Sequence, residues 1–185
     1  MEAGVVVRLG TGFVLLLAFC AKVRNPTAFR NALDGFALLP GRLVRPVSLV
    51  VLATEAVLGA LLIAGLFQRA ALVAGSGLFA LFAIAIALAS KRNGAIACGC
   101  LGTGVTLRTG PASAIVNGVA AVTSLLAVAA SPGYGADTSP SQLATGQGII
   151  LLLIGTLVAG VYWVAMYALS VLRLVEEAIT EGVVR

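Results

Sequence analysis

Residues 44–90 read VRPVSLVVLATEAVLGALLIAGLFQRAALVAGSGLFALFAIAIALAS, and this stretch decides the fold. A helix needs about 20 predominantly apolar residues to cross a bilayer. The stretch contains two such runs, 44–67 and 70–90, separated only by Gln68 and Arg69. Because so few residues join the two runs, they predict a tight hairpin of two membrane-spanning helices.

The rest of the chain has the same character. Of its 185 residues, 60% are hydrophobic and 10% charged, whereas a soluble domain has about 25% charged residues. Three further runs are long enough to span: 4–21, 111–131 and 146–172. The sequence therefore predicts an all-α fold, a polytopic membrane helical bundle of five transmembrane helices. All of 1–185 is expected to form a single integral membrane domain in the lipid bilayer.

A short amphipathic helix is predicted between the first two spans, at 27–39. Phe29, Ala32, Leu33 and Phe36 recur at helical spacing, with polar residues between them. This pattern is typical of a helix lying in the membrane interface.

Basic residues are distributed unequally between the two ends of the five predicted spans. The net charge of +5 is explained better by residues flanking membrane spans than by a nucleic-acid partner. Arg8 and Arg69 fall on one side. The positive-inside rule then places the N-terminus outside a bacterial inner (cytoplasmic) membrane, with the Cys98 loop and the C-terminus in the cytoplasm. The basic residues of that cytoplasmic side are Lys22, Arg24, Arg30, Arg42, Arg45, Lys91, Arg92, Arg108, Arg173 and Arg185.

Cys98 and Cys100 are separated by one glycine in the loop before the fourth span. Two thiols so close together can form a strained, easily reduced disulfide, which suits thiol exchange. Lys91 and Arg92 lie upstream, and positive charge favours the reactive thiolate. The alternatives are inert cysteines in a turn or a metal site, but the chain lacks histidine and has only three cysteines, so no metal site is predicted.

Two more residues are candidates. Cys20, near the end of the first span, is a core cysteine or a third thiol on the same side as Cys98. Glu55 is the one carboxylate deep in a predicted span, and such residues usually face the bundle interior and have a role. It is either a structural residue or a quinone or proton site. No basic residue in mid-span is expected to pair with it.

Several short motifs occur between the first span and the loop before the fourth span. They are Phe19-Cys20-Ala21-Lys22, Leu38-Leu39-Pro40, Thr54-Glu55-Ala56 followed by Gly59 and Gly65, Lys91-Arg92-Asn93-Gly94, and Cys98-Gly99-Cys100-Leu101-Gly102. Taken together, these motifs resemble the MauE family of methylamine utilisation membrane proteins, which belongs with the DoxX-like proteins. The last motif is similar to the Cys-Gly-Cys-Phe-Gly signature of that family, with leucine in place of phenylalanine.

The resemblance implies a DoxX-like four-helix core, here with one helix added, and a role in thiol redox chemistry. MauE is thought to work beside a thioredoxin-like partner in forming disulfides of a periplasmic enzyme, and DoxX-like relatives are associated with quinone-linked or thiol-stress electron transfer. Cys98 and Cys100 would then be the redox pair. A periplasmic role expects the cysteines outside, whereas the charge distribution puts them inside.

Two functions follow as expectations. In the first, the chain is a membrane thiol–disulfide oxidoreductase or electron-transfer component, with a thioredoxin-like partner and a quinone as electron acceptor. In the second, it is a non-catalytic accessory subunit packed on a larger respiratory or photosynthetic membrane complex. A transporter or channel is a weaker alternative, because one carboxylate gives a thin polar pathway and no broken-helix repeat is visible.

Overall fold

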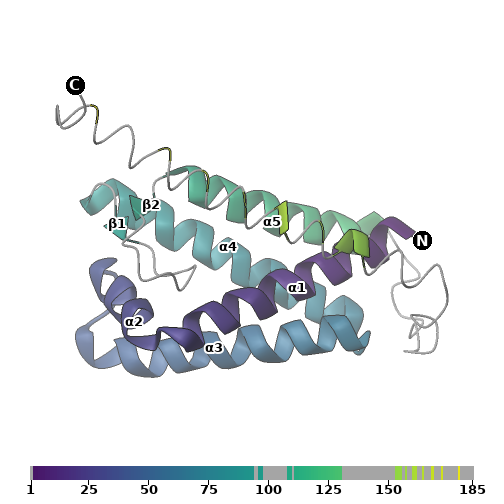
Figure 1. Ribbon diagram of the computed structural model, residues 1–185, viewed down its shortest axis with the longest axis horizontal. Coiled ribbons are helices and arrows are strands. Elements are labelled where there is room, and N and C mark those ends of the chain that lie inside the picture. Colours follow the sequence, from purple (N-terminus) through teal and green to yellow (C-terminus); the bar gives the residue numbers. More distant parts are fainter. Residues whose placement is uncertain are drawn as a thin grey trace.

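Long helices arranged up and down make up most of the computed structural model (Figure 1). It describes residues 2–93, 96–97, 108–109 and 111–130, with scattered positions between 153 and 179. The long helices are α1 (Glu2–Arg24), α3 (Gly41–Ala64), α4 (Gln68–Asn93) and α5 (Pro111–Ala130).

Each of these four helices is long and apolar enough to cross a membrane. They confirm the spans predicted at 4–21, 44–67, 70–90 and 111–131, and the chain is a multi-pass membrane protein. Large apolar side chains such as Leu49, Val57 and Leu81 are exposed on the outside of the bundle, as expected for helices surrounded by lipid. The predicted fifth span, 146–172, lies largely outside the described residues and stays a prediction.

The turn between α3 and α4 is as short as the sequence predicts. Gly65 ends α3 in the left-handed conformation, at φ 72°, which glycine adopts without a steric penalty. The Gln68 side chain then donates a hydrogen bond to the Gly65 carbonyl at 3.0 Å. Because α4 begins at Gln68, the two helices form a closed hairpin.

A short helix, α2 (Pro26–Gly35), follows α1 at one end of the bundle (Figure 1). Asn25 caps its N-terminus, accepting a hydrogen bond from the Ala28 N–H at 3.2 Å, and Pro26 occupies the first turn, where proline is favoured. The helix begins one residue before the predicted range of 27–39 and ends four residues before its end, at Gly35. Its placement in the membrane interface stays a prediction.

Two short strands lie at the same end of the bundle as α2 (Figure 1). The strands β1 (Ile96–Ala97) and β2 (Arg108–Thr109) pair antiparallel, with Ala97 opposite Arg108. Strand β1 also contacts α2 and α4. In the part of the chain that the structure describes, the fold is therefore helical apart from this pairing, which joins the residues flanking the segment 98–107.

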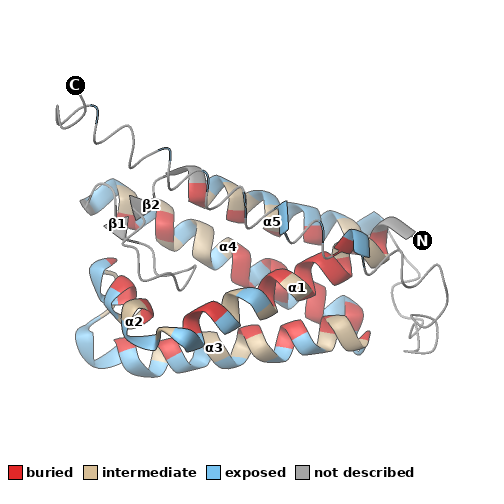
Figure 2. Cartoon of the chain, in the orientation of Figure 1, coloured by how far each residue is buried: buried red, intermediate tan, exposed pale blue. Residues whose placement is uncertain are grey.

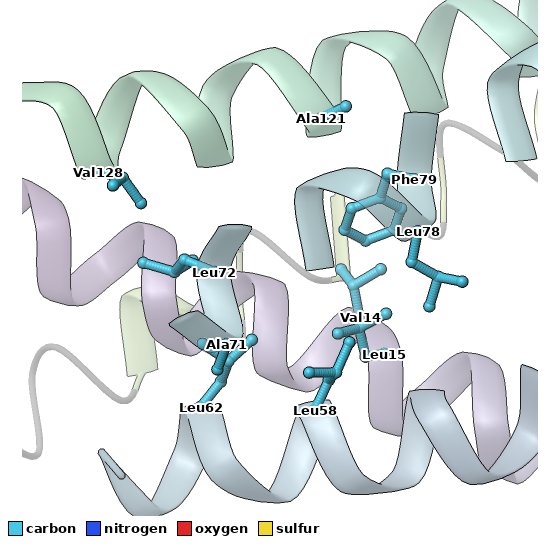
Figure 3. Packing of buried hydrophobic residues seen from close by; sticks show 10 residues of the cluster. All are labelled: Val14, Leu15, Leu58, Leu62, Ala71, Leu72, Leu78, Phe79, Ala121 and Val128. Carbon is cyan, nitrogen blue, oxygen red and sulfur yellow. The ribbon is translucent and has the colours of Figure 1, made fainter. Parts of the chain in front are cut away.

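Helix α1 lies at the centre of the bundle, where buried residues are concentrated (Figure 2). It contacts α3, α4 and α5, and half of its apolar window is buried, against 28–39% for the other three spans. The main core cluster joins all four long helices (Figure 3). Its members are Val14, Leu15, Leu58, Leu62, Ala71, Leu72, Leu78, Phe79, Ala121 and Val128.

A second apolar cluster lies under α2. Phe29, Leu33 and Phe36 of this segment pack against Val44 of α3 and against α4. These are the apolar positions that the helical spacing picked out, and their burial means that α2 covers this end of the bundle.

Candidate functional site

Glu55 lies inside the bundle, as its position in the span predicts, but it is not alone. The Lys22 ammonium donates a hydrogen bond to Glu55 Oε1, and the two side chains are only 2% and 1% exposed. The expectation that no basic residue pairs with Glu55 is therefore wrong. The physical reason is the length of α1: the helix continues to Arg24, so Lys22 is part of the span and not of the following loop.

Helices α1 and α3 pack closely, which brings Lys22 within reach of Glu55. At Gly59 an added Cβ would lie 2.8 Å from Leu16 Cγ and 3.2 Å from the Gly12 carbonyl oxygen. An added Cβ at Gly12 would likewise lie 3.1 Å from Leu62 Cβ. In lipid, small residues at a crossing allow helix backbones to approach closely, so Gly12 and Gly59 set the spacing across which Lys22 reaches Glu55.

Two aromatic rings complete the surroundings of the Lys22 ammonium. Its nitrogen lies 5.3 Å from the centre of the Phe29 ring and 5.2 Å from that of Phe82. Both distances are within the range of a cation–π interaction. The ammonium is thus held by a carboxylate from α3 and by rings from α2 and α4.

One oxygen of this site has an open hydrogen-bonding position. Glu55 Oε2 is buried, and no donor within the described part of the chain reaches it. A buried acceptor without a donor costs free energy, so this oxygen can accept a hydrogen bond or a proton from a further group.

The structure describes the position of one of the three cysteines. Cys20 is exposed on α1, two residues before Lys22. Cys98 and Cys100 lie outside the described residues, in the segment 98–107. Cys98 directly follows Ala97 of β1 in the sequence. Strand β1 contacts α2 and α4, at the end of the bundle where α1 ends.

Sequence reasoning missed Lys22, Phe29 and Phe82 as parts of one site. A signal for Lys22 was present: Asn25-Pro26 is a helix-start signal, so α1 can run up to it and include Lys22. Arg8 was also assigned to a membrane flank, but the structure buries it completely within α1. The sequence could therefore include Lys22 in the span, but its pairing with Glu55 depends on how α1 and α3 cross.

Fold and site together define a multi-pass helical membrane protein with a buried ion pair between α1 and α3. Residues 2–130, covering α1 to α5, match the family model of methylamine utilisation protein MauE. The chain therefore belongs to the MauE family, as its motifs indicated. Comparisons with curated proteins and with solved structures gave no match.

Proposed function

We propose that this MauE-family membrane protein is a thiol–disulfide redox and electron-transfer component, with Cys98 and Cys100 as its redox pair. The observation that carries this proposal is the pairing of Ala97 with Arg108. It joins the residues that flank the cysteine-containing segment, and β1 contacts α2 and α4 at this end of the bundle.

The chemistry is thiol–disulfide exchange with a thioredoxin-like partner. A partner thiolate attacks the Cys98–Cys100 disulfide, a mixed disulfide forms, and a second partner thiol releases the reduced pair. Lys91 and Arg92 are exposed at the end of α4, the helix that β1 contacts. Positive charge at this end favours the thiolate form of the pair.

Cys20 and Glu55 support this chemistry in different ways. Cys20 is exposed at the same end of the bundle and is proposed as a third thiol that resolves mixed disulfides. Glu55, with Oε1 bonded to Lys22, is proposed to accept a proton or a hydrogen bond through Oε2.

The proposed location is the bacterial inner membrane, with the N-terminus outside and the cysteine segment in the cytoplasm. Lys22 and Arg8 are buried, so neither counts toward a membrane side. The exposed residues Arg24, Arg42, Arg45, Lys91 and Arg92 lie at the end that carries α2 and the strands, and Arg69 lies at the opposite end. The charge asymmetry therefore persists after this correction.

Trapping of mixed disulfides tests the proposal. In intact cells, Cys98→Ser and Cys100→Ser taken singly are expected to accumulate a mixed disulfide with a partner, because the remaining thiol cannot be resolved. The double variant is the control and is expected to form none. Adding Cys20→Ser to each single variant should increase trapping, because the proposed resolving thiol is then absent. If neither single variant gives a mixed disulfide and the partner redox state is unchanged, the redox proposal is overturned in favour of an accessory subunit. Labelling the two thiols from each side of sealed membranes tests the orientation.

A further inference from the structure

A cavity of about 400 Å³ lies between α1, α4 and α5. Val14 and Phe79 form buried parts of its wall, whereas Ile115 and Val119 are 66% and 56% exposed. The cavity is therefore deep on the α1–α4 side and opens sideways along α5, toward the lipid that surrounds the spans.

The cavity lies at the depth of the hydrocarbon core of a bilayer. The 20 residues of α5 extend over about 30 Å, which is the thickness of that core. The wall begins at Ile115, about 6 Å along the helix from Pro111, and extends for about 12 Å to Thr123. From Thr123 to the end of α5 at Ala130 there remain about 10 Å. Both ends of the cavity are therefore well separated from the headgroup regions.

The described wall of this cavity is suited to an apolar occupant. It carries no charged side chain. Its hydroxyl groups already have hydrogen bonds: Thr11 Oγ1 lies 3.2 Å from Ser124 Oγ, and Thr123 donates to the Val119 carbonyl at 2.9 Å. A polar ligand would have to displace these bonds, whereas an apolar chain leaves them intact and has no polar group to desolvate.

The cavity is too narrow for a further helix. Its volume, spread over a length of about 12 Å, corresponds to a width of about 6 Å. A helix with its side chains is about 10–12 Å across. An acyl chain is flexible and only one methylene group wide, so it is the component of the hydrocarbon core that can enter this space.

We propose that the cavity binds one acyl chain of a membrane phospholipid, whose headgroup stays outside the spans. The chain enters through the opening along α5 and contacts α1, α4 and α5 together. Because lipid offers no hydrophobic driving force between membrane helices, the chain is held by van der Waals contacts with the three helices. The bound lipid therefore completes the part of the bundle that these helices leave open.

Photolabelling of the purified full-length protein in detergent tests this proposal. The probe is a phosphatidylcholine that carries a diazirine midway along one acyl chain. Saturable labelling of the α1, α4 and α5 peptides that line the cavity is expected, at one probe per protein. The same phospholipid with the diazirine in its headgroup is the matched probe, and it should leave these wall residues unlabelled.

Cavity-filling variants make the test specific. Ala120→Phe places a ring in the cavity and should weaken labelling by the acyl-chain probe roughly tenfold, because the chain must compete with the added side chain. Thr123→Phe, at the exposed rim, makes the same test if Ala120→Phe does not fold. Ala60→Phe, at an exposed alanine of α3 outside the cavity wall, is the matched control and should label like wild type.

Three outcomes would overturn the lipid site. They are labelling that does not saturate, labelling that both filling variants leave unchanged, and labelling of the outer face of α3 as strong as that of the cavity wall. The last result would mean that lipid only surrounds the bundle. The assignment uses neither Cys98 nor Cys100, so the double variant Cys98→Ser, Cys100→Ser should label like wild type, and failure of the redox proposal would leave the lipid site standing.

Discussion

Helix α1 presents two contrasting interfaces. Against α3 it packs at glycines, Gly12 facing Gly59, and the contact is completed by the buried Lys22–Glu55 pair. Against α5 its side-chain hydrogen bond is that of Thr11 with Ser124, beside a cavity. The α1–α3 side is thus close-packed and carries an ion pair, whereas the described cavity wall on the α1–α5 side carries no charged side chain. The difference indicates that α1 packs tightly against α3, whereas the α1–α5 interface has space for a small ligand.

Breaking the ion pair is expected to have the largest effect. Glu55→Ala leaves the Lys22 ammonium buried without its carboxylate and should lower the free energy of unfolding by about 3–5 kcal/mol. Unfolding in mixed detergent micelles measures this. The double variant Lys22→Met, Glu55→Leu should recover most of the loss, because it removes both charges and keeps the volume. Asp34→Ala, at an exposed carboxylate, is the control; equal stabilities of Glu55→Ala and Asp34→Ala would contradict the prediction.

Disturbing the glycine contact ranks second. In Gly59→Ala the new Cβ would lie 2.8 Å from Leu16 Cγ, and such overpacking costs about 1–3 kcal/mol. The same unfolding assay applies, and adding Leu16→Ala should restore part of the stability. Gly77→Ala is the matched control because nothing lies within 4 Å of its added Cβ. A Gly59→Ala protein as stable as Gly77→Ala would show that α1 and α3 are not closely packed.

Removing an aromatic ring from Lys22 should have a smaller effect. Phe82→Leu keeps an apolar side chain but loses the cation–π contact, at an expected cost of about 1 kcal/mol. In a Lys22→Met background the same substitution should cost less, and the difference between the two backgrounds measures the coupling. Phe67→Leu, at an exposed phenylalanine in the α3–α4 turn, controls for loss of a ring. Equal costs in both backgrounds would rule out the cation–π contribution.

Weakening the contact between α1 and α5 should have the smallest effect on the free energy of unfolding. Thr11→Val removes the hydrogen bond to Ser124, and such bonds between membrane helices contribute about 0.6 kcal/mol on average. Ser124→Ala should cost the same, and the double variant little more than either. Thr54→Val is the control, since the Thr54 hydroxyl bonds within its own helix, to the Val50 carbonyl at 2.8 Å. A loss as large as that of Glu55→Ala would erase the contrast between the two interfaces.

The features that the sequence predicted are those set by local composition. Hydropathy alone locates four spans, and the two residues between the runs at 44–67 and 70–90 predict the hairpin. Burial of Glu55 follows from its depth in a span. Its partner does not, because Lys22 reaches Glu55 through the crossing of two helices. The cavity is equally invisible in sequence, since it is a space between three helices and not a property of any one of them.

Family membership was predictable for a different reason. The motifs that suggested it lie between Phe19 and Gly102, inside the matched residues 2–130. The charge-based orientation used the same sequence but assumed that every basic residue faces water. Arg8 and Lys22 violate that assumption, which shows that single charges near predicted span ends are weaker indicators than exposed clusters.

The pairing of Ala97 with Arg108 limits how far the thiols can travel. Consecutive Cα atoms are 3.8 Å apart, so the Cα atom of Cys100, three residues on, stays within about 11 Å of that of Ala97. The reach of the cysteine pair from β1 is therefore short. Under the proposed redox function, a partner protein would exchange electrons with the pair at this end of the bundle.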